Sequence, residues 1–103
     1  MSRIELPTLH WLVSAHEGRT VTNAYSASLG TLPGTGCMNV RTFNYKVFVD
    51  ITARRLIAES HILNPWRDGG NKSDFERAEF EVSDSGVLLA GEWLSQMATK
   101  YGF

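Results

Sequence analysis

The chain has 103 residues, of which 43% are hydrophobic and 20% are charged, and its formal net charge is -1. These values are typical of one globular domain, here residues 1–103, whose core needs neither a metal nor a disulfide. Because the net charge is so close to zero, the chain lacks the general electrostatic attraction that drives sequence-independent nucleic-acid binding.

The cysteine count and the apolar pattern bear on the compartment. Cys37 is the only cysteine, which excludes an intrachain disulfide and a cysteine-based zinc site and favours a reducing environment. The N-terminus has no continuous apolar segment, and the chain nowhere reaches the run of about 18 apolar residues that a membrane span needs. We therefore expect a cytoplasmic protein that does not interact with membranes.

The N-terminal third predicts a hairpin. Alternation from His10 to His16 places Trp11 on the buried side of a strand and Leu12 on the solvent side. The alternation resumes from Val21 to Leu29, and the turn residues between the two segments would join them as a hairpin. The glycine and proline content from Gly30 to Gly36 then predicts a loop.

The strongest pattern in the chain predicts a central strand from Asn39 to Ile51. From Phe43 to Ile51 the odd positions are all apolar, while three of the four even positions are polar. Side chains on a strand point alternately to its two faces, so this pattern indicates one buried and one solvent-exposed side. It is typical of an antiparallel sheet with one covered face.

The segment from Arg55 to Leu63 predicts the next strand, with its even positions facing the core. A loop from Thr52 to Arg55 would then place Ile51 opposite Leu56. A helix from Ala53 to Leu63 is the competing interpretation, because alanine, arginine, leucine and glutamate are good helix formers.

The last third predicts a loop, a strand and a helix. The polar stretch from Asn64 to Asp74 reads as a loop, and the alternation from Arg77 to Val82 predicts a fifth strand. Ser83 is a typical helix N-cap and Gly102 a typical stop. At helical spacing one apolar stripe gathers Val87, Ala90, Trp93, Leu94, Met97, Ala98 and Tyr101. The expected fold is therefore α+β: an antiparallel sheet of four or five strands followed by one C-terminal helix packed on one face.

Candidate catalytic and metal-binding residues are few and dispersed. His10 and His16 would lie about 20 Å apart on an extended strand at roughly 3.3 Å per residue, too far to share one ion. His61 reads as a surface residue, and Cys37 has no sequence neighbour that could act as its base. We therefore expect no enzymatic activity, no metal site and no cofactor.

Apolar residues on the solvent side of the sheet indicate a docking surface. Phe48 and Ile57 have outward parity on adjacent strands, and Lys46 and Arg55 lie beside them. Trp66 adds a residue type that dominates interface hot spots, although it would equally serve as a lid over the open end of the sheet. We predict partner binding through Lys46, Phe48, Arg55, Ile57 and Trp66.

The leading functional hypothesis is a small non-enzymatic protein-binding module, acting as an inhibitor or accessory protein, and a homodimer is compatible with it. The expected architecture is similar to that of many small inhibitors and accessory proteins of phages and plasmids, including anti-CRISPR proteins, a likeness of architecture alone. The alternative is a single-stranded nucleic-acid-binding module in which Phe48 or Trp66 stacks on bases while Lys46, Arg54 and Arg55 hold phosphates. A small enzyme would require histidines, Cys37 and a carboxylate to converge in one pocket.

Overall fold

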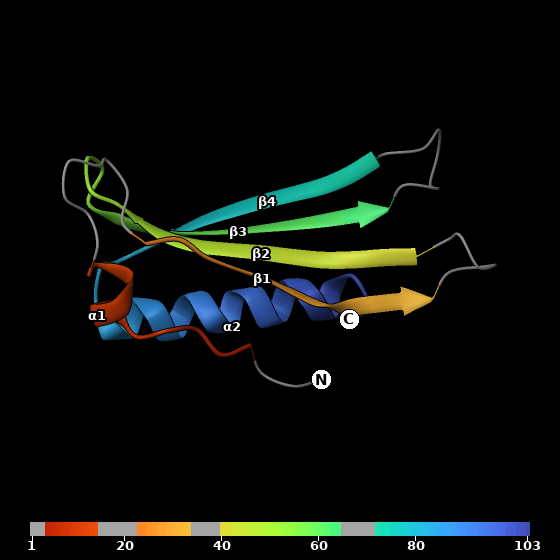
Figure 1. Cartoon of the computed structure of the whole chain (residues 1–103), viewed down its shortest axis with the longest axis horizontal. Helices are drawn as coiled ribbons and strands as arrows, with labels where there is room; N and C mark the ends of the chain where they lie inside the picture. The colour runs from red at the N-terminus through yellow and green to blue at the C-terminus, as the bar shows by residue number, and fades with distance from the viewer. Residues whose placement is uncertain (1–3, 15–22, 34–39, 65–71) are drawn as a thin grey trace.

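The computed structural model describes residues 4–14, 23–33, 40–64 and 72–103. In chain order the elements are α1 (Leu9–Leu12), β1 (Tyr25–Pro33), β2 (Val40–Asp50), β3 (Arg55–Asn64), β4 (Lys72–Phe80) and α2 (Asp84–Lys100). The strands form one antiparallel sheet in the order β1-β2-β3-β4, and α2 packs across one face of it (Figure 1). The predicted α+β fold is confirmed, with four strands.

The alternation of β2 and β3 places their apolar residues against α2. Phe43, Val47, Leu56 and Ala58 are fully buried, and Leu94 of α2 belongs to the same cluster. The helix-facing parity predicted for both strands is therefore right, and the competing helix from residue 53 to residue 63 is wrong. At roughly 25 cal/mol per Å² of apolar surface removed from water, this layer is the main stabilising contribution to the fold.

The turn between β2 and β3 differs from the prediction by two residues. Val49 lies opposite Leu56, whereas the sequence suggested Ile51 at that place. The Asp50 Oδ1 atom accepts a hydrogen bond from the Ala53 N–H at 3.1 Å, and Arg54 adopts a positive φ of 55°. This tight turn ends the pairing of β2 with β3 earlier than predicted. A register shift of two residues nevertheless leaves every side chain on its predicted face.

The strand predicted from His10 to His16 is wrong over its described part, which contains α1. The Thr8 hydroxyl accepts a hydrogen bond from the Trp11 N–H at 3.2 Å and so caps the helix. Helical rather than alternating spacing then reverses the predicted exposure: Leu12 is fully buried, whereas Trp11 is 42% exposed. The predicted hairpin therefore lacks its first strand, and its turn lies outside the described residues.

Two predicted loops are too long. β1 continues through Gly30 to Pro33, and β4 begins at Lys72, inside the segment expected to be a loop. Gly30 has no partner on β2 because the register shifts between Leu29 and Thr31, which makes it a β-bulge, a place where glycine is common. Backbone pairing with β2 and β3 extends these strands through residues with little side-chain alternation.

The helix α2 begins and ends as predicted. The Ser83 hydroxyl accepts the Gly86 N–H at 3.0 Å, and Gly102 has a φ of 87° just beyond the last turn. The stripe that it presents to the sheet includes the fully buried Ala90, Leu94 and Ala98. Two of these three residues are alanines, which allow the helix to approach the sheet closely.

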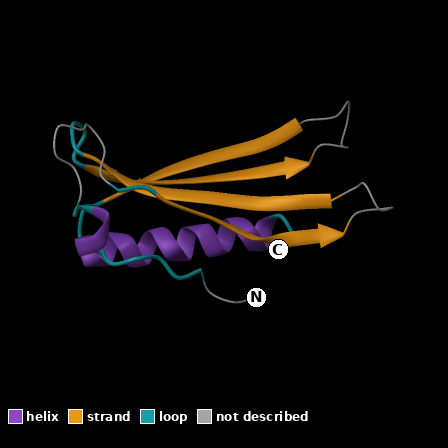
Figure 2. Cartoon of the chain, viewed as in Figure 1, coloured by secondary structure: helices purple, strands orange, loops and turns teal. Residues whose placement is uncertain are grey.

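The N-terminal segment packs along α2 on the side away from β4. The Ile4 N–H donates to the Ser95 Oγ atom at 3.0 Å, and a Cβ at Gly91 would lie only 3.2 Å from the Ile4 carbonyl oxygen. The ring of Trp11 meets that of Tyr25 edge-on, with centroids 6.3 Å apart, which keeps α1 on the same side. Figure 2 shows both helices on one side of the strands. Neither helix covers the other face of the sheet.

Candidate partner-binding face

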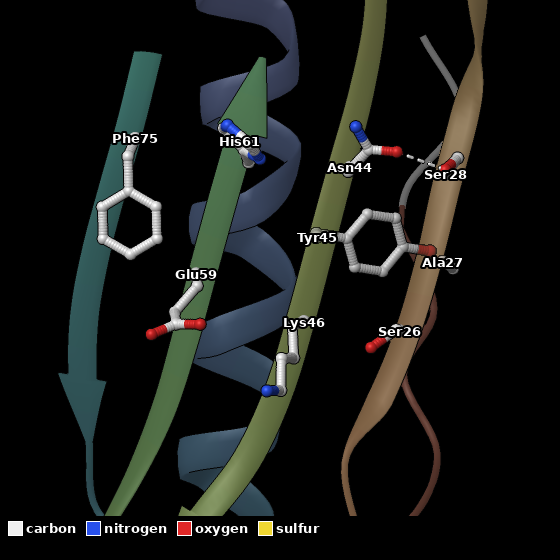
Figure 3. A pocket seen from close by; sticks show the side chains of 9 residues that line it. All are labelled: Ser26, Ala27, Ser28, Asn44, Tyr45, Lys46, Glu59, His61 and Phe75. Carbon is white, nitrogen blue, oxygen red and sulfur yellow. Dashed lines mark hydrogen bonds between the residues drawn. The ribbon is translucent and has the colours of Figure 1, made fainter. Parts of the chain in front are cut away.

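We call the side of the sheet that faces away from α2 the outer face. Its side chains are those of opposite parity to the core residues, and cross-strand pairing arranges them in rows. The members described are Ser26, Ser28, Thr42, Asn44, Lys46, Phe48, Asp50, Arg55, Ile57, Glu59, His61, Phe75, Arg77 and Glu79. Figure 3 shows part of this face, with α2 behind the strands.

The first row crosses all four strands and ends at an exposed aromatic ring. The Ser28 hydroxyl donates to the Asn44 side-chain oxygen, Asn44 lies opposite His61, and His61 lies opposite Phe75 (Figure 3). The His61 and Phe75 rings meet edge-on with centroids 6.4 Å apart. Phe75 is 58% exposed, which is unusual for a phenylalanine held in a strand. A large apolar group is thus presented beside polar side chains that can orient a ligand.

The second row alternates in charge. Lys46 of β2 lies opposite Glu59 of β3, and Glu59 lies opposite Arg77 of β4. The Lys46 Nζ atom lies 5.1 Å from the centroid of the Phe48 ring, close enough for a cation–π interaction. The row offers both signs of charge to a partner.

The third row consists of Phe48 of β2, Ile57 of β3 and Glu79 of β4, and it differs in part from the predicted site. Phe48 and Ile57 are direct cross-strand partners, so the expectation that they are neighbours is right. Phe48 is half-buried, however, and Ile57 is fully buried although it points away from α2. Ile57 lies on a central strand between Phe48 and Glu79, and Glu79 is held by Arg55 at 3.7 Å. The expectation that Ile57 is an exposed anchor is therefore wrong.

A shallow hollow of roughly 370 Å³ lies over the first two rows. Its lining combines Ser26, Ala27, Ser28, Asn44, Tyr45, Lys46, Glu59, His61 and Phe75. Phe75 and His61 lie on β4 and β3, Glu59 and Lys46 lie on β3 and β2, and the hydroxyl and amide groups and the Tyr45 ring lie toward β1 (Figure 3). The lining can hold an apolar side chain against a ring while hydrogen-bonding the chain that carries it.

Tyr45 lies beneath this hollow, and burial shifts its pKa. Tyr45 points to the helix side of β2, and its ring centroid lies 6.3 Å from that of Tyr25. Desolvation raises the pKa of Tyr45, and the neighbouring Tyr25 hydroxyl raises this pKa further. Tyr45 is therefore a neutral structural residue at physiological pH.

Of the five residues predicted to bind a partner, the structure brings four together. Lys46 and Phe48 lie on β2, Arg55 and Ile57 lie on β3, and Trp66 lies outside the described residues. Phe75 is absent from the predicted site, because it falls between the predicted loop, which ends at Asp74, and the predicted strand, which begins at Arg77. The signal was the alternation of Phe75, Arg77 and Glu79 with Glu76, Ala78 and Phe80.

Two further properties concern the described residues alone. They contain no group of three or more histidine, cysteine, aspartate or glutamate side chains placed to hold a metal ion. Neither of their helices combines the length and the apolar composition needed to cross a membrane.

Comparison with known proteins gave no match to any family model, any curated protein or any solved structure. The fold defines the chain as an α+β domain in which both helices lie on one side of the sheet.

Proposed function

We propose that the protein is a small non-enzymatic protein-binding module and that the outer face is its docking surface. The observation that supports this most directly is Phe75, which exposes 58% of its surface on the face opposite to both helices. An aromatic side chain held by a strand costs little conformational entropy when it binds, which makes it an effective interface anchor.

The charges of the outer face support a protein partner over a polyanion. Three cations (Lys46, Arg55 and Arg77) are interspersed with three anions (Asp50, Glu59 and Glu79). A surface of mixed sign creates no net field toward phosphates, whereas it complements a protein segment that carries charges of both signs. The partner that we propose places an apolar side chain beside Phe75 and opposite charges beside Lys46 and Glu59.

Inhibition is the form of this function that needs no chemistry of its own, because a bound module blocks the surface that it covers. The single cysteine, Cys37, fits a reducing compartment, and we place the interaction in the cytoplasm. Arg55 and Phe48 would contribute to the rim of the interface, and Ile57 would support them from beneath.

Affinity capture from nuclease-treated lysate tests the proposal when matched variants are used as bait. Phe75→Ser removes the exposed ring of the outer face, and Leu88→Ser removes a residue of equal exposure on α2, on the opposite side of the molecule. We expect a defined protein to be retained by wild type and by Leu88→Ser and lost with Phe75→Ser. Retention by Phe75→Ser, or loss with Leu88→Ser alone, would contradict the proposal.

A single-stranded nucleic acid is the second candidate, supported by the exposed Phe75 and His61 rings beside Lys46. Base stacking on such rings is worth about 1 to 3 kcal/mol per base. Titration of fluorescent oligonucleotides at two salt concentrations separates the candidates. A phosphate binder loses affinity steeply as salt rises, whereas a protein interface anchored mainly by apolar side chains loses much less.

A further inference from the structure

The two edges of the sheet differ in how open they are to a further strand. β1 carries the bulge at Gly30 and ends at Pro33, which has no backbone N–H to donate. β4 runs from Lys72 to Phe80 with an unbroken register against β3 and no proline. Bulges and prolines protect an edge from pairing with another chain, so the edge of β4 is the open one.

The charge pattern of β4 selects one way of pairing with a second copy. In a two-fold antiparallel pair one residue lies on the axis opposite its own copy. With Glu76, Arg77 or Glu79 on the axis, identical charges would face each other. With Ala78 on the axis, the two alanines meet, and Arg77 of each copy lies opposite Glu79 of the other. Of the alignments centred on these residues, this is the one with opposite charges at both sites and no like-charge pair.

The same alignment continues the charge alternation of the outer face. The second row of one copy runs Lys46, Glu59, Arg77 and would be followed by Glu79 of the second copy. Arg77 and Glu79 are both exposed, and Glu79 keeps half of its side-chain surface open although Arg55 contacts it. Both residues are therefore free to pair across the edge.

Other residues near the edge are compatible with a neighbour there. Glu76 on the helix-facing side accepts hydrogen bonds from the Tyr101 hydroxyl at 3.1 Å and from the Lys100 ammonium at 3.5 Å, so its charge is compensated within the chain. Trp93 packs edge-on against Phe80, and Leu89, one helical turn earlier on the same side of α2, is 53% exposed. An apolar side chain thus lies exposed on the side of the helix nearest the open edge.

We propose that the protein forms a homodimer by antiparallel pairing of β4 with β4 of a second copy, with Ala78 at the two-fold axis. The two sheets become one continuous sheet whose outer faces join, and both α2 helices lie on its other side. The dimer is compatible with the proposed partner, because Phe75 and Lys46 remain on the outer face that the two copies share.

Sedimentation equilibrium of the full chain over a range of concentrations tests the dimer, and a charge swap tests its register. Arg77→Glu places a glutamate opposite Glu79 at both symmetric sites, and Glu79→Arg places an arginine opposite Arg77. Each single variant should weaken dimerisation roughly tenfold to a hundredfold, because two attractive cross-strand pairs become repulsive. The double variant Arg77→Glu with Glu79→Arg restores both pairs and should restore the dimer.

Lys46→Glu is the matched control, since it reverses a charge on the same face two strands away and should leave the dimer intact. Circular dichroism of each variant at the concentrations used confirms that the fold is kept. A wild-type protein that stays monomeric throughout would overturn the proposal. So would a dimer that both single charge reversals leave unchanged, or a double variant no more dimeric than the single ones.

Discussion

The two faces of the sheet follow the same alternation but carry different kinds of side chain. The helix-facing side holds Phe43, Val47 and Leu56 in a fully buried layer beneath α2. The outer face carries hydroxyls, amides, charges of both signs and the exposed ring of Phe75. Packing therefore determines the residue types on one face, whereas the other is free to carry recognition. Identical substitutions on the two faces should have very different effects.

The largest effect is expected for Phe43→Ala on the helix-facing side. Phe43 is fully buried and its ring centroid lies 5.8 Å from that of Phe103. Removing such a ring leaves a cavity as well as losing burial, and it should lower the free energy of unfolding by about 3 to 5 kcal/mol. Urea denaturation measures the loss. A value below about 1 kcal/mol, typical of a surface change, would show that α2 does not close this layer.

Ile57→Ala should lower the free energy of unfolding by an intermediate amount. Ile57 has outer-face parity but is fully buried, unlike its neighbours in the row. We expect a loss of about 2 kcal/mol, near the lower end for isoleucine truncation, because Ile57 is buried but lies outside the main core cluster. The same denaturation experiment checks this. A negligible loss of unfolding free energy would indicate that Ile57 is exposed, as its parity alone suggested.

Tyr45→Phe should be mild near neutral pH and informative at alkaline pH. Loss of the hydroxyl interaction costs about 1 kcal/mol at neutral pH. Burial raises the pKa of Tyr45 above the ordinary 10.0, so the folded state favours the neutral phenol. That contribution is fully present below pH 10.0 and is lost as pH rises through the raised value. Wild type should therefore lose more stability than Tyr45→Phe in a denaturation series above this pH, and parallel losses would contradict the assignment.

Phe75→Ala should have the smallest effect on stability. Most of the ring is in solvent and its one described ring contact is His61. The free energy of unfolding should change by no more than about 0.5 kcal/mol, the usual range for surface substitutions. Differential scanning calorimetry beside Phe43→Ala gives the direct contrast. A loss comparable to that of Phe43→Ala would mean that Phe75 is part of the core.

Much of this fold could be predicted from the sequence because strict alternation and helical spacing each specify a buried face. From Phe43 to Asp50 the apolar period allows one strand orientation, and Ser83 and Gly102 bound α2 through their backbone geometry. Around Trp11 the alternating residues also satisfied a helical spacing, and the Thr8 cap decided between the two patterns. Turn closure at Asp50 set the register by a side-chain hydrogen bond that alternation does not reveal.

The candidate site was less predictable because exposure depends on neighbours in space. Ile57 is fully buried, and its parity gave no sign of this. Phe75 lies opposite His61 only because β4 begins three residues before it, in a stretch that reads as a loop. Pairing with β3 therefore places an exposed ring on the outer face at a position that lies just before the predicted strand.

We propose that the outer face, and not the helix side, contacts a partner. The most direct measurement is a set of backbone amide chemical shifts recorded on the labelled protein with and without the captured partner. We expect the largest chemical-shift changes at Asn44, His61 and Phe75. Changes centred on Leu88 and Leu89 of α2, with the outer face unperturbed, would contradict it.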